Sequence, residues 1–369
     1  MKNENYKHII FFYPSFEKGG VEKILITLIK FFLKKKFKLT LISSKINIKI
    51  DDKNFNHHLL KKHKNRLHSI YGAMIALKEK LKEQKKKNLN KNTIVFSLQS
   101  NSAAIIISKL FNTKIIIRNS EYILGGLISK DENIIKTLFT LFQKIIFYNL
   151  CNYIIANSKG SELILKRILF LKKIKYIYNP YLKKVNKINN LKRKNNILFV
   201  GRFVRQKGIF FLLKAFKLLK IKNYNYKLIL VGDGPDKKKI KKFIELNDLK
   251  KDVKIINWTK NLSKYYLSSK IFVLPSLYEG LGNVVIESLN FFTPTLVSNC
   301  KSGPSEIILN GKAGYIFKKK SIIDLLRNII IIDKNYDQAK KKAVFGNKSL
   351  NRFLINSQCE KYLKILNKI

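Results

Sequence analysis

Cysteine, long apolar runs and acidic residues are all scarce in this 369-residue sequence. The three cysteines, Cys151, Cys300 and Cys359, lie far apart, which excludes a disulfide framework and a cysteine-rich zinc site. No apolar run reaches about 18 residues without a charged residue or an amide, so no membrane-spanning helix is expected. The first apolar stretch is short and lacks a small-residue cleavage site, which argues against a cleavable signal. These absences favour a reducing compartment, and we expect a cytoplasmic protein.

The shortage of acidic residues leaves a large positive charge. The sequence has 75 lysines and arginines but only 23 aspartates and glutamates, a formal net charge of +52. Nucleic acid or an anionic membrane could attract such a chain. Lysine, isoleucine and asparagine, however, crowd every part of the sequence, as AT-rich codons would produce, so we attribute most of the charge to composition. Of the functional explanations, peripheral attachment to an anionic membrane is favoured, and no specific nucleic-acid site is expected.

Short apolar runs alternate with helix-length segments along the chain, and the hydrophobic fraction of 46% excludes global disorder. The expected strands are His8–Tyr13, Lys38–Ser43, Thr93–Leu98, Lys114–Arg118, Asn152–Ala156, Asn196–Val200, Lys227–Val231, Val253–Ile256, Ile271–Leu274 and Thr295–Val297. The helix-length segments between them include Val21–Lys35, Asn133–Leu150, Ile209–Lys220 and Asn283–Phe292. Such alternation predicts parallel sheets covered on both faces, with enough strands for two sheets.

The break between the two sheets falls in a Lys/Asn-rich stretch after Asn179-Pro180, which lacks apolar periodicity. We therefore expect an N-terminal domain over 1–180, a linker over 181–195 and a second domain over 196–350. A C-terminal helix over 351–369 is expected to pack back towards the first domain.

Glycine is also scarce, which makes its placement informative. Nine of the 16 glycines fall between Gly201 and Gly314, mostly after the ends of expected strands. Because ligands of open α/β sheets bind outside the carboxyl ends of the strands, the second domain is expected to be the main ligand-binding half.

Two glycine-containing loops are candidate phosphate sites. Gly19 and Gly20 lie between the first strand and the first helix, where the backbone could approach a ligand closely; a plain tight turn is the alternative. Gly201 ends a strand, and the loop that follows carries Arg202 and Lys207 at a phosphate-sized distance. In so basic a chain, a chance pair of cations is the alternative for this second loop.

A third turn, Gly232-Asp233-Gly234-Pro235, follows a strand and leads into a helix with Asp236 near its N-cap. Its two aspartates stand three apart across Gly-Pro, so it is not a metal-binding Asp-x-Asp, and we interpret it as architectural. We expect no metal site. The histidines at 57, 58, 63 and 68 lie among lysines without a nearby carboxylate, so they do not change this expectation.

The strongest motif runs from Ser276 to Glu287, after a strand that ends at Leu274-Pro275. A helix opens near Asn283, and the first backbone N–H groups, around Gly282, Asn283 and Val284, could hold a diphosphate. Glu287 lies one turn further on the same face and could reach ribose hydroxyls, whereas Glu279 precedes the loop. The alternative is compensation of the helix dipole by Glu279 and a surface position for Glu287.

These motifs resemble those of a known enzyme family. Two glutamates separated by seven residues across a glycine loop resemble the Glu-x7-Glu signature of family 4 glycosyltransferases, which have the GT-B fold. The order Gly-Gly-x-Glu, Gly-Arg to Lys-Gly, Gly-Asp-Gly-Pro and Glu-x7-Glu is similar to that family from Gly19 to Glu287. The segment from Asn299 to Ile307 is similar to members that extend polysaccharides or lipid-linked oligosaccharides.

The resemblance implies two Rossmann-like domains that face each other across a cleft. It implies a retaining, metal-independent transfer of a hexose or N-acetylhexosamine from a nucleotide diphosphate sugar, most simply a UDP-sugar, with no cofactor. The acceptor would be a glycan or a lipid-linked oligosaccharide in cell-surface polysaccharide synthesis. The protein would then lie at the inner face of the cell membrane.

The resemblance also assigns roles to residues. Arg202 and Lys207 would bind the donor diphosphate, Glu287 the ribose, and Glu279 the transferred sugar. Gly19 and Gly20 would close over the phosphates from the other domain. Arg202, Lys207 and Glu279 are the candidate catalytic residues, and the donor would also be bound by Gly201, Gly282, Asn283 and Val284.

The sequence departs from the family pattern near the end of the fourth N-domain strand, where many relatives carry a histidine. Here the residues are Ile117-Arg118-Asn119-Ser120-Glu121, and Arg118, Asn119 or Glu121 could take over sugar contacts. Two other functions stay open: a basic nucleic-acid-binding protein, and a GT-B epimerase or phosphorylase acting on sugars.

Three apolar features have two possible uses each. The segment Ile134–Leu150 has apolar residues at helical spacing, and we expect core packing, with membrane docking as the alternative. The Lys-rich apolar segment Ile24–Lys36 is a candidate for membrane contact by the N-terminal domain. Trp258, the only tryptophan, follows a strand end and could lie near the nucleotide base or in the core.

Overall fold

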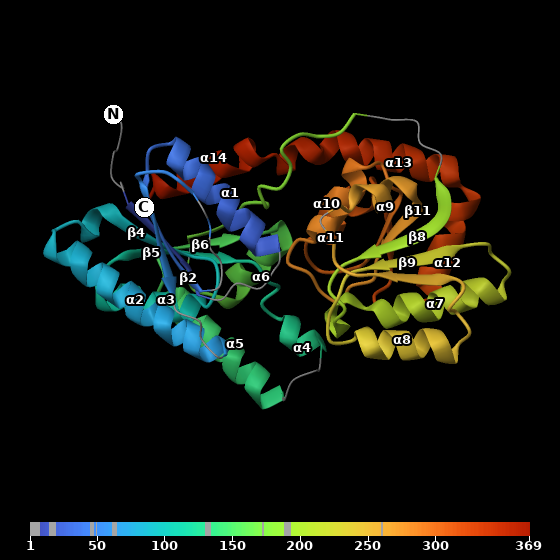
Figure 1. Ribbon diagram of the computed structural model, residues 1–369, viewed down its shortest axis with the longest axis horizontal. Helices are drawn as coiled ribbons and strands as arrows, with labels where there is room; N and C mark the ends of the chain where they lie inside the picture. The colour runs from blue at the N-terminus through green and yellow to red at the C-terminus, as the bar shows by residue number, and fades with distance from the viewer. Residues whose placement is uncertain are drawn as a thin grey trace. The chain divides into compact units, whose positions relative to one another are not determined.

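The computed structural model describes residues 8–14, 20–44, 48, 50–60, 65–129, 134–171, 173–187, 193–259 and 261–369. The chain divides into two compact units, and many of their elements are labelled in Figure 1. The first unit comprises Met1–Leu124, Glu132–Tyr181 and Ile355–Ile369; the second comprises Gly125–Asp131 and Leu182–Leu354. Each unit contains a parallel sheet with helices, which confirms the expected α/β class with two Rossmann-like sheets.

The sheet of the first unit has seven strands in the order β3-β2-β1-β4-β5-β6-β7, all parallel. The strands are β1 (His8–Tyr13), β2 (Lys38–Ser44), β3 (Phe55–Leu60), β4 (Thr93–Ser97), β5 (Lys114–Asn119), β6 (Tyr153–Ala156) and β7 (Ile174–Tyr176). Because side chains alternate along a strand, β1 supplies Ile9 and Phe11 to one core and Ile10 and Phe12 to the other. The uninterrupted apolar sequence of β1 is therefore that of a strand buried on both faces.

Helices cover both faces of this sheet (Figure 1). One core includes residues of α1 (Gly20–Lys34) and α14 (Ile355–Leu366). The other includes residues of α2 (Arg66–Lys86), α3 (Asn101–Leu110), α5 (Ile134–Asn149) and α6 (Lys159–Ile168). A short 3-10 turn, η1 (Asn90–Asn92), precedes β4. Most apolar residues of α1 are buried in the first of these cores, so they are not available to a membrane; membrane contact through the lysines of Ile24–Lys36 stays a prediction.

The sheet of the second unit has six strands in the order β10-β9-β8-β11-β12-β13, again all parallel. The strands are β8 (Lys194–Val200), β9 (Lys227–Val231), β10 (Val253–Ile256), β11 (Ser269–Leu274), β12 (Thr295–Ser298) and β13 (Tyr315–Phe317). The helices of this unit are α4 (Gly125–Ser129), η2 (Arg205–Lys207), α7 (Ile209–Ile221), α8 (Lys237–Leu246), α9 (Ser263–Ser268), α10 (Asn283–Asn290), α11 (Pro304–Ile307), η3 (Leu309–Gly311), α12 (Ile322–Lys334), α13 (Tyr336–Lys348) and η4 (Ser349–Phe353). In Figure 1, α7 and α8 lie on one side of this sheet and α9 and α10 on the other.

All the expected strands are confirmed to within one or two residues at each end. Three strands were not expected: β3, β7 and β13. All three are edge strands, and β3 is partly exposed while β7 and β13 are short. A strand of this kind needs no continuous apolar run, so the sequence carries little signal for it. Within the expected linker, residues 188–192 lie outside the described residues, and β8 begins at Lys194.

Candidate active site

The centre of the second sheet is the place where its strand order reverses. The chain runs from β8 through β9 to β10 on one side, and then returns to β11, β12 and β13 on the other. Since β8 and β11 are parallel neighbours, their carboxyl ends meet at the same edge of the sheet. Such a switch point is where open α/β sheets bind ligands. The loops that follow these two strands carry the predicted site residues of this unit: Gly201, Arg202, Lys207, Glu279, Gly282, Asn283, Val284 and Glu287.

The two loops are joined by close backbone contacts. Gly208 has a φ of 65°, and a Cβ at this position would lie 2.0 Å from the carbonyl oxygen of Pro275. Only glycine fits this left-handed conformation and this close approach. The backbone N–H of Leu277 donates to the Gln206 carbonyl over 2.7 Å, and Gln206 Nε2 donates to the Tyr278 carbonyl over 3.0 Å. The Lys207 and Glu279 loops therefore form one structural element.

Lys207, which is predicted to bind the donor phosphates, contacts Glu279, which is predicted to bind the transferred sugar. Lys207 Nζ donates to Glu279 Oε1 over 2.5 Å, and the two side chains are only 14% and 7% exposed. Ser276 Oγ donates to the same carboxylate oxygen over 2.7 Å. The carboxylate is thus held by two donors in a place with little water, where electrostatic interactions are strong.

Arg202 lies on the same loop but is exposed to solvent. The loop rests on the Gly232–Asp236 turn: the Phe203 N–H donates to the Asp233 carbonyl over 2.7 Å, and the Asp236 N–H donates to the Phe203 carbonyl over 3.0 Å. A Cβ on Gly232 would lie 1.9 Å from the Gly201 carbonyl oxygen. These contacts agree with a structural role for that turn, which packs against the Arg202 loop and fixes its backbone.

The first turn of α10 follows directly on the Glu279 loop. Gly282 is its N-cap with a φ of 89°, and Asn283 and Val284 are half-buried. The first N–H groups of a helix have no partner within that helix, so this turn can hold an anion. Glu287 lies one turn further along α10, where its Oε2 accepts a hydrogen bond from Tyr266 Oη over 2.9 Å.

Other side chains at this site were not foreseen from the sequence. Tyr266, on α9, is fully buried and stacks on Phe291. Ser302 Oγ donates to the Glu279 backbone carbonyl over 2.6 Å. Ser276, three residues before Glu279 and just after a strand end, had a usable local signal. Ser302 lies within the segment from Asn299 to Ile307 that resembles the family, although its contact with Glu279 could not be foreseen, and Tyr266 had no signal because it comes from another element.

Cys300 lies beneath the same loop. Its Sγ donates to the Ser276 carbonyl over 3.2 Å. Burial raises the pKa of the Cys300 thiol to about 11, and the nearby Glu279 charge also raises it. The thiol is therefore protonated at neutral pH and is not a nucleophile here.

The glycine pair of the first unit is only partly described. Gly20 begins α1, the first helix after β1 in the chain, and β1 and β4 flank the switch point of that sheet. Gly19 lies outside the described residues. The role of both glycines over the donor phosphates stays a prediction.

Arg118 has a structural position rather than an open one. It is buried at the end of β5, and its Nε donates to Tyr362 Oη of α14 over 2.9 Å. Its two terminal nitrogens donate to Ser120 Oγ and Asn179 Oδ1. Arg118 thus ties β5 to α14 and to the segment after β7. Of the other two residues considered for sugar contacts, Asn119 is also buried, and its Nδ2 donates to the Glu121 carbonyl over 2.6 Å.

The position of Trp258 excludes one of its two expected uses. Trp258 follows β10 and is 58% exposed, so the alternative expectation that it packs in the core is wrong.

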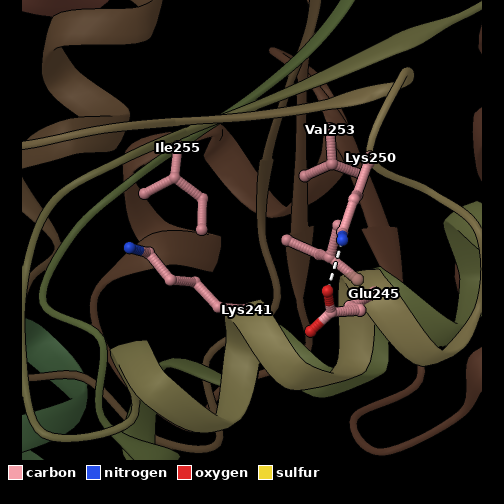
Figure 2. Close-up of a pocket in the computed structure, with 6 residues that line it drawn as sticks. Lys241, Glu245, Lys250, Val253 and Ile255 are labelled. Carbon is pink, nitrogen blue, oxygen red and sulfur yellow. Dashed lines mark hydrogen bonds and ion pairs between the residues drawn. The ribbon is translucent and has the colours of Figure 1, made fainter.

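A hollow between α8 and β10 is lined by Lys241, Ile244, Glu245, Lys250, Val253 and Ile255, with an ion pair between Lys250 and Glu245 (Figure 2). None of the predicted donor-binding residues lines this hollow. Within the described parts of the chain, no group of three His, Cys, Asp or Glu side chains is placed to hold a metal ion.

Comparison with known proteins gives the same fold and a family match for the second unit. The structure of an Anabaena protein, HepE, in complex with UDP and glucose superimposes with a TM-score of 0.77 at 14% identity, over 99% of this chain and 100% of that one. An N-acetylgalactosamine-N,N'-diacetylbacillosaminyl-diphospho-undecaprenol 4-alpha-N-acetylgalactosaminyltransferase of Campylobacter jejuni is 26% identical over 368 residues, which cover 96% of this chain and 98% of the relative.

A second relative, described as an uncharacterized glycosyltransferase of Methanocaldococcus jannaschii, is 31% identical over 221 residues, 55% of this chain. The chain spans about half of that relative, 53% of its length. Residues 182–350 match the family described as Glycosyl transferases group 1. The two Rossmann-like units are those of the GT-B fold. The second unit, whose main segment is Leu182–Leu354, thus matches the glycosyl transferases group 1 family over nearly its whole length.

Proposed function

We propose that this protein is a retaining, metal-independent glycosyltransferase. It transfers a hexose or N-acetylhexosamine from a nucleotide diphosphate sugar, specifically a UDP-sugar, to a glycan or lipid-linked oligosaccharide during cell-surface polysaccharide synthesis. The observation that carries the proposal is the buried Lys207–Glu279 pair beside the first turn of α10, at the switch point of the second sheet. The UDP and glucose named for HepE and the lipid-linked substrate named for the Campylobacter relative support the donor and acceptor classes.

The leaving diphosphate must be stabilised as its bond to the sugar breaks. Arg202 supplies an exposed guanidinium, and the first turn of α10 supplies backbone N–H groups. Lys207 has three ammonium protons, so it can keep Glu279 and still donate to a phosphate oxygen. Lys207 would also separate the negative charges of Glu279 and the diphosphate.

The two glutamates then act on different parts of the donor. Glu287 accepts from the ribose hydroxyls, with its orientation set by Tyr266. Glu279, fixed by Lys207 and Ser276, accepts from hydroxyls of the transferred sugar. The acceptor hydroxyl attacks the anomeric carbon from the face that the phosphate leaves, and a phosphate oxygen takes its proton. The new bond therefore keeps the anomeric configuration.

The experiment is a screen of nucleotide sugars for thermal stabilisation and for release of the nucleoside diphosphate, each with and without chelator. We expect one UDP-sugar to stabilise the protein and to be turned over in chelator, with an α-linked product from an α-linked donor by NMR. Loss of turnover in chelator and its return with added metal would disprove the metal-independent part. An epimerised sugar or a sugar phosphate as product would instead identify an epimerase or a phosphorylase.

We further propose that the protein works in the cytoplasm, at the inner face of the cell membrane. Of the helices that the structure describes, none has the length and apolar content needed to cross a bilayer. Attachment would therefore be peripheral and would be weakened by salt, since anionic lipids attract lysine-rich surfaces.

A further inference from the structure

Helix α5 of the first unit is attached to its core along one narrow side. Thr137 and Tyr148 are its buried residues, and Tyr148 Oη accepts a hydrogen bond from Asn101 Nδ2 of α3 over 3.1 Å. Leu141 and Ile145 are half-buried beside them. The expectation that the apolar residues of this segment pack in the core is therefore wrong for most of them, because only this side of the helix meets the core.

The opposite side of α5 is apolar and exposed. Ile135, Phe139, Phe142 and Ile146 are 73%, 60%, 60% and 44% exposed. Their spacing of four, three and four residues places them on one stripe of a helix. Leu138, beside the stripe, is also exposed. An apolar stripe of this kind on a solvent-exposed surface indicates a binding surface.

The charges around this stripe favour a lipid surface over a protein partner. The segment Ile134–Asn149 contains two lysines, Lys136 and Lys144, and neither aspartate nor glutamate. Asp131 and Glu132 precede this segment in the sequence, so the excess of lysine over acid is a property of the helix itself. Apolar side chains with lysines on the same helix are typical of helices that lie in the headgroup region of a bilayer. The net charge of +52 would add attraction to anionic headgroups.

A second exposed stripe lies on the same side of the sheet. Leu67, Tyr71 and Ile75 stand four residues apart on α2 and are exposed. Helices α2 and α5 contribute to the same core, and α3 packs against both of them. The two stripes therefore belong to one helical layer of the first unit.

We propose that the α5 stripe, Ile135, Phe139, Phe142 and Ile146, is a docking surface that inserts into the headgroup region of an anionic phospholipid bilayer. The proposal deepens the proposed function, because it rests on an acceptor carried at a membrane. Vesicle binding is measured without any substrate, however, so a failure of docking and a failure of sugar transfer are separate results.

The test uses the full chain with vesicles of equal parts phosphatidylglycerol and phosphatidylcholine, followed by sedimentation. A variant with Phe139→Ser and Phe142→Ser is compared with a matched control, Phe345→Ser, on α13 of the second unit, where the side chain is 51% exposed. We expect the double variant to lower the vesicle partition coefficient by about tenfold or more, and the control to leave it unchanged. Release of nucleoside diphosphate from a water-soluble donor should be the same in all three proteins.

A second measurement reports insertion directly. In a Trp258→Phe background, Phe142→Trp should show a blue-shifted emission when vesicles are added, whereas Phe345→Trp should not. Equal vesicle binding by the double variant and the wild type would overturn the proposal. So would a wild-type dimer that becomes monomeric in the double variant and binds no vesicles in either form, because the stripe would then be an interface between two copies of this chain.

Discussion

Lys207 Nζ lies 2.5 Å from Glu279 Oε1 where the loops after β8 and β11 meet. Each of these side chains compensates the charge of the other away from bulk water. Removal of one partner leaves the other charge buried and unpaired, which costs more than removal of both. The pair therefore contributes to the stability of the second unit as well as to its proposed chemistry.

Lys207→Met is expected to lower the free energy of unfolding of the second unit by about 3–5 kcal/mol. Lys207→Met combined with Glu279→Gln should restore most of this loss but not activity. Urea unfolding followed by Trp258 fluorescence measures this, because the only tryptophan lies in that unit. If the loss of stability in the double variant equals the sum of the losses in Lys207→Met and in Glu279→Gln alone, the two charges are not coupled.

Arg202→Ala should leave stability nearly unchanged, because the side chain is exposed. Loss of its charge-assisted contact should weaken binding of UDP by about 10- to 100-fold. Arg205→Ala is the matched control, since Arg205 is another exposed arginine of the same loop. Isothermal titration calorimetry decides the matter: a similar loss in both variants would indicate general attraction by positive charge and remove the specific role of Arg202.

Glu287 should be responsible for discrimination between ribose and deoxyribose. In the wild type, UDP should bind more tightly than its deoxy analogues, and in Glu287→Gln this difference should shrink by about 3- to 10-fold. Tyr266→Phe should give a smaller effect of the same sign, because it removes the hydrogen bond that orients Glu287. If the preference for ribose survives Glu287→Gln in full, the carboxylate binds something else.

His8 should make the first unit sensitive to acid. Its ring is buried between Thr40 and Gln84, and burial, the largest cause, lowers its pKa to about 4 from an ordinary value near 6.5. The unfolded chain therefore takes up a proton that the folded chain resists. This contribution is fully present above about pH 6.5 and is lost as the pH falls towards 4.

Between about pH 7.5 and pH 5, the wild type should lose roughly 2 kcal/mol more stability than His8→Gln. Glutamine is chosen because it can still bond with Thr40 and Gln84. Unfolding followed by far-UV circular dichroism measures the effect, with Trp258 fluorescence as the control for the second unit. Parallel pH profiles for the two proteins would show that His8 is not the group responsible.

Much of the fold could be predicted from the sequence because buried parallel strands have a local signature. The continuous apolar run of β1 and the glycines after β8 and β11 are visible without any tertiary information. The edge strands β3, β7 and β13 lack this signature, because they are short or partly exposed. The order of the glycine and glutamate motifs also indicated the glycosyltransferase family before the fold was known.

The contacts within the candidate site could be predicted only in part. The spacing of Asn283 and Glu287 follows from helix geometry, and it was expected. The approach of Lys207 to Glu279 depends on the pairing of β8 with β11. Strand β8 ends at Val200 and β11 begins at Ser269, so 68 residues separate the two strands in the sequence. The bond from Tyr266 to Glu287 joins α9 to α10 and has no signal in either segment.

The sequence by itself determined which segments form the buried strands and the helices between them, the position of the glycine loops, and the kind of chemistry that two acids and two cations can perform. Only the tertiary structure decided the use of side chains that can serve in two ways. Helix α5 is apolar on more than one side, so its periodicity could not say which side would be buried; the position of α3 leaves Phe139 and Phe142 in solvent. From the sequence, Arg118 is likewise a candidate for binding the sugar. In the structure it donates a hydrogen bond to Tyr362, 244 residues away. The physical reason is the same in both cases: burial and pairing are set by neighbours that are distant in the chain, and a local pattern does not contain them.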